Sequence, residues 1–208
     1  IYKSGVYELP TSELVWRLLR NVRDSAFVDV GANVGYYSVL ARTRLGSNGA
    51  VIALEPMPLL YDKLERNTAG MQVDTHRMAA SNESGEAILS VPVGSFENDG
   101  IATLEPCEGA VDRFVVNTIS LDDLVGGEVA ILKIDVEGHE YNVLQGAKTL
   151  LSRGRIRNII FEDHTGPRSP TASFLGSFGY EIFSIGWDRN QLILGRSAVA
   201  RRTYLNDA

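Results

Sequence analysis

The sequence predicts an α/β fold in which helices cover both faces of an open, mostly parallel sheet. Short apolar runs rich in β-branched residues alternate along the chain with longer segments whose apolar residues recur every three or four positions. Several of the short runs end directly in acidic residues. This alternation is typical of a doubly wound sheet, which binds ligands at the carboxyl ends of its strands. We expect a single domain over residues 1–208, with residues 1–25 as an N-terminal helical lead-in.

Length and composition are those of one ordinary globular domain. The chain has 208 residues, of which 44% are hydrophobic and 22% are charged. A net charge of −6, without any block of like charges, disfavours a nucleic-acid partner. The single cysteine, Cys107, excludes an intrachain disulfide and favours a reducing compartment. No apolar stretch approaches the length of a membrane span and no signal peptide is visible, so we expect a cytoplasmic protein without a membrane partner.

The lead-in predicts a helix that packs on the sheet. Thr11 or Ser12 provides a helix cap, and apolar residues follow on one face as far as Val22. Glu8 stands just before this helix and upstream of the first strand. It is either a solvated acid or an acid that folds over the site formed by the next segment.

Residues 27–38 predict a nucleotide-type cradle. Residues 27–30 suit a short buried strand, and glycines follow at Gly31 and Gly35. Apolar residues then recur with helical spacing from Val34 to Leu45. A glycine turn between a strand and a helix brings a ligand close to bare backbone and to unpaired N–H groups. The alternative is a turn of the same kind that holds no ligand.

The spacing of the glycines disfavours a dinucleotide. A pyrophosphate-binding turn reads G-x-G-x-x-G, whereas Ala32 and Asn33 stand here where the second glycine is expected. Asp29 lies just before the glycines, where a carboxylate repels phosphate and suits a cationic or amino-bearing ligand. The D-x-G-x-x-x-G pattern looks like the first motif of the class I S-adenosylmethionine (SAM) methyltransferases, whose ligand carries an ammonium and a sulfonium.

The second strand ends in an acid that is placed to bind a ribose. Residues 51–54 suit a buried strand that runs into Glu55, roughly 20 residues after the cradle, where doubly wound folds bind ribose hydroxyls. A carboxylate accepts both hydroxyl protons. Enzymes that use NAD and enzymes that use SAM share this device, so Glu55 indicates a ribose and does not distinguish the two. A strand-end acid that faces water is the alternative.

The middle of the chain predicts a site for a flat ring. A helix over residues 58–70 begins at a proline, and residues 73–80 suit a third strand. This strand ends in small residues, so we place the adenine near Ala80 and Ser81. Further strands are expected at residues 87–91 and 113–116, joined by a connection rich in turn-forming residues.

Two later strands run into acids and histidines. Residues 129–134 suit a buried strand that is followed by Asp135, Glu137, His139 and Glu140. The next strand, residues 158–161, runs into Glu162, Asp163 and His164. Charges clustered at neighbouring strand ends indicate chemistry more than packing. A helix ending near residue 154 separates the two strands, and a helix over residues 169–179 and a terminal hairpin (180–185 and 191–194) follow.

At this point the sequence resembles the FkbM-type methyltransferases. The resemblance runs from about residue 5 to residue 206, and the string K-I-D-V-E-G-x-E at residues 133–140 is its most specific part. The other segments that carry it are residues 29–38, 55–56, 79–82, 98–100 and 120–124. It implies a class I, Rossmann-like SAM methyltransferase fold, with a seven-stranded, mostly parallel sheet whose last strand is antiparallel. It also implies SAM-dependent O-methylation, usually of a hydroxyl on a sugar or a polyketide-type natural product.

The resemblance, together with the strand-end positions, gives a set of residues expected to bind the cofactor. These are Glu8, Asp29, Gly31, Asn33, Gly35, Glu55, Ala80, Ser81, Asp135 and Glu137. The nucleic-acid N-methyltransferases carry [DN]-P-P-[FYW] at the end of the fourth strand. The sequence D-V-E-G stands at that place here, so methylation of a base is disfavoured.

Methyl transfer to an alcohol needs alignment and a base near the acceptor oxygen. His139 and His164 are candidates for the base, and Asp135 is a third catalytic candidate, unless it orients the acceptor or the methionine end of SAM. A metal mechanism remains open, because Asp135, Glu162 and Asp163 form a set of hard oxygen ligands that suits Mg²⁺.

Two other classes of function remain open at the level of sequence. One is an NAD-type oxidoreductase, against which the glycine spacing and Asp29 count. The other is a SAM-fold module that binds a partner without catalysis, against which the intact motifs count. We expect a small-molecule acceptor, and such domains often pair as homodimers.

Overall fold

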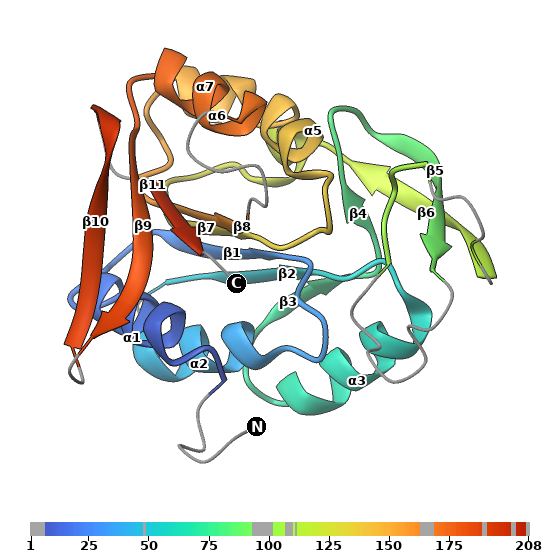
Figure 1. The fold of residues 1–208 in the computed structure, drawn as a ribbon. Helices are drawn as coiled ribbons and strands as arrows, with labels where there is room; N and C mark the ends of the chain where they lie inside the picture. Colours follow the sequence, from blue (N-terminus) through green and yellow to red (C-terminus); the bar gives the residue numbers. More distant parts are fainter. Residues whose placement is uncertain are drawn as a thin grey trace.

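The computed structural model describes residues 7–47, 49–92, 102–106, 110, 112–162, 169–188, 191–200 and 203–206. Its helices lie in two layers on either side of a twisted sheet (Figure 1). The helices of the layer drawn below the sheet are α1 (Leu9–Leu18), α2 (Tyr36–Leu45) and α3 (Pro58–Thr68). Those of the layer above it are α5 (Glu140–Gln145), α6 (Lys148–Ser152) and α7 (Pro170–Ser177). The predicted α/β fold with helices on both faces is confirmed.

The main sheet is mostly parallel, as predicted. In the described part of the chain it has eight strands in the order β10-β9-β11-β8-β7-β1-β2-β3. They are β1 (Ala26–Val30), β2 (Val51–Leu54), β3 (Asp74–His76), β7 (Val129–Ile134), β8 (Ile159–Glu162), β9 (Glu181–Asp188), β10 (Gln191–Ala200) and β11 (Thr203–Asn206).

The implied count of seven strands with an antiparallel last strand is not confirmed. The last strand in the chain, β11, is parallel to both β8 and β9. The antiparallel pairing belongs to β10, which forms the predicted terminal hairpin with β9. Because β10 lies at the edge of the sheet, the chain returns from the hairpin to insert β11 between β8 and β9.

The core is centred on β1 and β7, which are buried at every position. Alternate side chains of β1 face opposite layers: Val28 and Val30 pack with α5 and α6, whereas Phe27 packs with α1 and α2. Burial on both faces explains why these central strands are nearly continuous apolar runs, interrupted only by Asp29 in β1 and Lys133 in β7. No helix within the described ranges is long and apolar enough to cross a bilayer.

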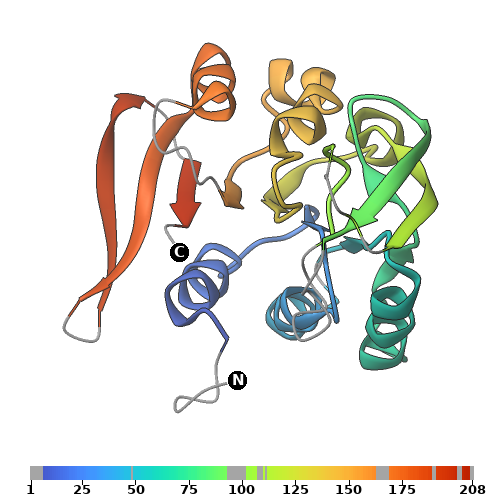
Figure 2. The same ribbon diagram turned by 45° about the vertical axis from the view of Figure 1, so that its right-hand side comes forward.

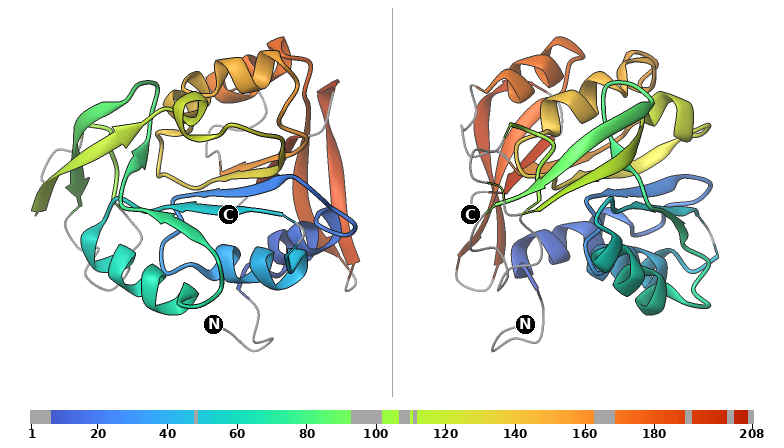
Figure 3. Two further views of the ribbon diagram at one scale, coloured as in Figure 1. Left: turned by 180° about the vertical axis from the view of Figure 1, so that it is seen from behind. Right: turned by 90° about the vertical axis from the view of Figure 1, so that its right-hand side faces the viewer.

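A second sheet of three strands lies beside the main one (Figures 2 and 3). Its order is β4-β6-β5, with β4 (Ala79–Ala80), β5 (Gly85–Val91) and β6 (Asp112–Ile119). The predicted strand over residues 73–80 is therefore two strands. β3 pairs with β2 in the main sheet, whereas β4 pairs with β6. The chain crosses between the sheets just before Ser81, and this crossing places Ser81 at the site.

Two predicted helix features are wrong. The first helix begins earlier, at Leu9, with Pro10 in its first turn. Glu8 occupies the N-cap position, so Thr11 and Ser12 lie inside the helix and do not cap it, and the Ser12 hydroxyl donates to the Tyr7 carbonyl. The helix after β7 is divided into α5 and α6 at Gly146, which packs against the backbone of Ser81.

A short helix, α4 (Leu121–Leu124), supports this division. Its Ser120 hydroxyl accepts the amide of Asp123 at 3.1 Å. The Asp122 carboxylate accepts the amides of Thr149 and Leu150 at 2.8 and 2.9 Å, at the start of α6. The family segment at residues 120–124 is thus a set of helix caps.

We expect Gly31→Ala to destabilise the fold by about 3 kcal/mol or more. Gly31 has φ +74°, and a Cβ built there would overlap the carbonyl oxygen of Asp135. Gly46 is a matched control, since it has φ +57° and nothing within 4 Å of the same position. Gly46→Ala should cost only about 1 kcal/mol. Urea unfolding of the two variants measures the difference, and equal losses would show that the contact with Asp135 is unimportant.

Candidate functional site

The glycine turn after β1 is packed between three other segments. The amides of Gly31 and Ala32 donate to the carbonyl of Leu54 at 3.0 and 2.9 Å, which fastens the end of β1 to the end of β2. A Cβ on Gly35 would lie 2.7 Å from Leu64 of α3. Gly31, Asn33 and Gly35 all have positive φ. Glycine is therefore required here for packing of the turn, and the same geometry presents the Asn33 amide to Glu55.

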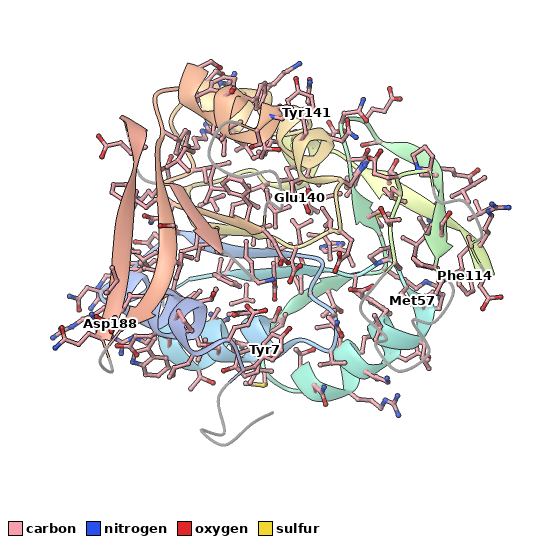
Figure 4. The ribbon with its side chains drawn as sticks, viewed as in Figure 1. Tyr7, Met57, Phe114, Glu140, Tyr141 and Asp188 are labelled. Carbon is pink, nitrogen blue, oxygen red and sulfur yellow. The ribbon has the colours of Figure 1, made fainter. Side chains whose placement is uncertain are left out.

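Glu55 is held in a fixed orientation by the backbone. One carboxylate oxygen accepts the amide of Asn33 at 2.8 Å, and the other accepts the amide of Met57 at 2.9 Å. The residue is only 5% exposed, and burial raises the pKa of its carboxyl to about 7 despite these two hydrogen bonds. Each oxygen retains lone-pair capacity for a further donor. Met57 itself packs toward Phe114 of β6, where the two sheets meet (Figure 4).

Asp29 is a fully buried acid with one unsatisfied oxygen. Its Oδ2 accepts the Ser38 hydroxyl at 2.7 Å, whereas Oδ1 has no hydrogen-bond partner among the described residues. Burial raises the pKa of Asp29, against the opposing effects of Lys133 and Ser38. A buried carboxylate oxygen without a donor is costly, so the position favours a ligand that brings a donor or a positive charge.

Lys133 is the cation at the centre of these acids. Its ammonium bonds Asp135 at 2.9 Å and lies 4.7 Å from the centre of the Tyr37 ring. Burial alone lowers the pKa of Lys133, but the carboxylates of Asp135 and Asp29 outweigh this and raise it above its ordinary value. Lys133 therefore stays protonated at neutral pH. The sequence analysis did not single it out, although its alternation with Asp135 on one strand face was a usable signal.

The N-terminal segment closes one side of the site. Glu8 accepts the hydroxyl of Tyr37 at 2.6 Å, which places Glu8 against the first turn of α2. A contact of Glu8 with a ligand stays a prediction. The rings of Tyr7, Tyr36 and Tyr37 meet edge to face at centroid distances of 5.1 to 6.4 Å. Burial and the neighbouring Glu8 raise the pKa of Tyr7 to about 12 and also raise that of Tyr37. Neither phenol is a base at neutral pH.

The carboxylate of Glu140 stabilises the turn after β7. Glu137 and Gly138 have φ of +51° and +98°. The Glu140 carboxylate accepts the amide of Gly138 at 3.1 Å, and burial raises its pKa. Figure 4 shows Glu140 at the start of α5, above the strand ends. The last glutamate of the K-I-D-V-E-G-x-E string thus stabilises the turn that presents Asp135 and Glu137.

His139 is engaged through both ring nitrogens. Nε2 lies 3.0 Å from the Ser81 hydroxyl, and Nδ1 lies 2.7 Å from a carboxylate oxygen of Glu105. Asn142 approaches the same Nδ1 at 3.1 Å. His139 is 8% exposed. Glu105 was missed by the sequence analysis, because it belongs to no motif and reaches His139 from a distant connection.

The predicted adenine residues lie at the end of β4. Ala80 is buried, and the amide of Ser81 donates to the carbonyl of Ile119 at 3.0 Å. The Ser81 hydroxyl also lies 3.1 Å from the side-chain oxygen of Asn82. Small side chains at this strand end leave the position suited to a flat ring, which stays a prediction.

The Mg²⁺ prediction is not supported. Asp135 is paired with Lys133, and within the described ranges no three His, Cys, Asp or Glu residues are grouped so as to hold a metal. Glu162 ends β8, whereas Asp163 and His164 lie outside the described residues.

The raised pKa of Glu55 predicts a pH dependence of stability. Between its ordinary value of 4.5 and about 7, the folded protein binds more protons than the unfolded chain. The free energy of unfolding should therefore fall as pH rises through this window, by up to about 3 kcal/mol from this group. Urea unfolding at pH 5 and pH 8 tests this: Glu55→Gln should show a weaker fall than the unmodified protein, and an equal fall would contradict the assignment.

The chain is similar to proteins that are named as methyltransferases. The chain is 33% identical over 150 residues to hexuronic acid methyltransferase AglP of Haloferax volcanii, which covers 69% of this chain and 57% of that protein. It is 26% identical over 193 residues to methyltransferase sdnD of Sordaria araneosa, which covers 74% of this chain and 73% of that protein. The precorrin-6y C5,15-methyltransferase of Geobacter metallireducens superposes with a TM-score of 0.48 at 15% identity, over 94% of this chain and 87% of that one.

The chain thus spans little more than half the length of its archaeal relative. Residues 29–182, from the buried acid of β1 into β9, match the methyltransferase FkbM domain. This match covers well over half of the sequence and includes Glu55, Ser81, Asp135 and His139. The chain therefore belongs to the FkbM methyltransferase domain family.

Proposed function

We propose that this protein transfers a methyl group from SAM to a hydroxyl of a sugar or a polyketide-type natural product. The observation that carries the proposal is Glu55, whose two oxygens are oriented by the amides of Asn33 and Met57 at the end of the second strand. That is the place where doubly wound folds bind ribose hydroxyls. Family membership supports a methyl donor as the nucleotide.

The charges of the site fit SAM better than NAD. The ammonium of Lys133 lies among the carboxylates of Glu8, Asp29 and Asp135. It already forms an ion pair with Asp135. The excess of carboxylates and the unpartnered Oδ1 of Asp29 suit the ammonium and sulfonium of SAM. The same charges oppose a pyrophosphate, which counts against the oxidoreductase alternative.

The remaining expected contacts follow from position. Glu55 would hold the ribose, Ala80 and Ser81 the adenine, and Glu8, Asp29 and Asp135 the cationic end. The turns that carry Gly31, Asn33, Gly35 and Glu137 would shape the walls between them. When bound, SAM supplies an activated methyl group on sulfur.

We assign Asp135 as the base. Its side chain is 32% exposed at the end of β7, so it is accessible to an acceptor, while Lys133 fixes its direction. With SAM supplying the methyl group, Asp135 would receive the proton that the acceptor hydroxyl releases. His139 is a weaker candidate because Ser81 and Glu105 occupy both of its ring nitrogens. His164 lies outside the described residues.

The acceptor class is proposed from the relatives. The archaeal relative is named for hexuronic acid, which favours a sugar hydroxyl as the acceptor here. A polyketide-type acceptor is the second possibility within the same reaction, and a screen of both classes separates them. A partner-binding module without catalysis would bind SAM and methylate neither.

The first test of the proposal is binding of S-adenosylhomocysteine, measured by calorimetry. The unmodified protein should bind it, and Glu55→Ala should weaken binding by at least about tenfold, because two charge-assisted hydrogen bonds are lost. Glu83→Ala, at an exposed position, is the matched control and should bind normally. A well-folded protein that does not bind S-adenosylhomocysteine would overturn the assignment of the cofactor.

The second test concerns Asp135. Transfer of labelled methyl from SAM is measured with methyl glucuronoside and methyl glucoside as acceptors. Asp135→Asn keeps an oxygen for Lys133 but removes the base, so kcat should fall by about 100-fold or more. Because Asp135 is also expected at the cationic end of SAM, the affinity for S-adenosylhomocysteine should fall as well, but by a smaller factor than kcat. Unchanged kcat in the Asn variant would move the role of base to another residue.

A further inference from the structure

Three residues from distant parts of the chain form a continuous hydrogen-bonded group, which we call the clasp: Ser81, His139 and Glu105. The imidazole lies between the Ser81 hydroxyl at 3.0 Å and the Glu105 carboxylate at 2.7 Å. Ser81 follows β4, where the adenine is expected, whereas Glu105 belongs to the connection between β5 and β6. The clasp therefore joins the expected cofactor side of the site to a segment that reaches the turn after β7.

Thr103 attaches the short segment of residues 102–106 to two other parts of the molecule. Thr103 exchanges two backbone hydrogen bonds with Ser90 of β5, at 2.8 and 3.0 Å. Its hydroxyl donates to the carbonyl of Glu137 at 2.8 Å and accepts the amide of Glu105 at 3.1 Å. The segment thus spans from the small sheet to the turn after β7. Glu105 adds two side-chain links from this segment to the start of α5, one to His139 at 2.7 Å and one to Asn142 at 3.3 Å, and His139 also contacts Ser81.

The protons of the clasp are coupled. If Nδ1 of His139 donates to Glu105, the neutral ring leaves Nε2 as an acceptor for the Ser81 hydroxyl. If the ring carries both protons, Nε2 donates to Ser81, and the hydroxyl turns toward Asn82. Glu105 also accepts the side-chain amide of Asn142 at 3.3 Å, and that amide approaches Nδ1 of His139, so the ring orientation that satisfies Ser81 sets the arrangement of both donors at Glu105. A change at Ser81 is therefore felt at Glu105.

We propose that His139 is a positioning residue that couples the cofactor side of the site to residues 102–106. Occupation of the adenine side fixes Ser81, Ser81 fixes the ring of His139, and the ring holds Glu105 and with it the segment next to Glu137. This inference rests on the proposed function, since it takes the ligand beside Ser81 to be the adenine end of SAM. Its consequence is that the cofactor prepares the acceptor side before the acceptor arrives.

The test is amide hydrogen exchange by NMR, with S-adenosylhomocysteine as the probe. The amides of Thr103 and Glu105 are protected only while the segment is in place. In the unmodified protein, saturation with the probe should slow their exchange by about tenfold, a typical strength of coupling between sites. In Glu105→Ala the probe should slow them by less than twofold. A merely structural contact would raise exchange equally with and without the probe.

Two further variants complete the design. Glu105→Gln keeps an oxygen for Nδ1–H, so it should retain part of the coupling. Glu86→Ala removes an exposed acid from β5 and should retain all of it. Because coupling is reciprocal, Glu105→Ala should also weaken binding of the probe. The loss of affinity should equal the ratio between the slowing of exchange in the unmodified protein and the slowing in the variant.

The outcomes separate this inference from the proposed function. Micromolar binding with equal slowing in the unmodified protein and Glu105→Ala would overturn the clasp and leave the cofactor assignment standing. Binding with no slowing in the unmodified protein would do the same. No binding to the folded protein would overturn both. If Glu105→Ala does not fold, Glu105→Gln provides the comparison, and slowing and affinity equal to those of the unmodified protein would overturn the clasp.

Discussion

The rest of the site depends on the close approach of the turn after β1 to the turn after β7. Because Gly31 has no side chain, the carbonyl of Asp135 lies where a Cβ would otherwise stand. Amides of the same turn donate to the last carbonyl of β2, so the ends of three neighbouring strands are joined through the backbone. Asp29, Glu55 and Asp135 lie at these three strand ends. Their spacing is therefore determined by backbone packing, and mobile side chains contribute little to it.

The buried carboxyl groups of the site favour a positively charged ligand, and their burial reduces the stability of the fold without it. Burial raises the pKa of both Asp29 and Glu55, which means that the fold keeps two carboxyl groups where ionisation is unfavourable. Lys133 offsets part of this cost, but its ammonium is committed to Asp135. A cationic ligand relieves the remainder, and the relief is part of its binding free energy. Under the proposed function, the same charges that reduce the stability of the fold increase its affinity for a cationic cofactor.

Short sequence patterns predicted the strands and turns that depend on neighbouring residues. They did not predict features that depend on contacts between distant segments. The strands, the glycine turn and the strand-end position of Glu55 follow from short stretches of sequence with clear periodicity. The division of the helix after β7 could not be predicted, because it depends on Gly146 meeting the backbone of Ser81. The transfer of β4 to a second sheet depends on its pairing with β6, some 40 residues later. Glu105 has no local signature at all, because its role exists only through His139.

Because the chain crosses from the main sheet to the small sheet, the residues of the site are supported by two different sheets. Glu55 and Asp135 follow strands of the eight-stranded sheet, whereas Ser81 and Thr103 are attached to the three-stranded one. Changes at Thr103 or Glu105 can therefore alter this side of the site without disturbing the hydrogen bonds that join β2, β1 and β7. Under the proposed function, the residues that hold the cofactor and those next to the turn after β7 can then vary separately, which makes residues 102–106 a target for redesign of acceptor specificity.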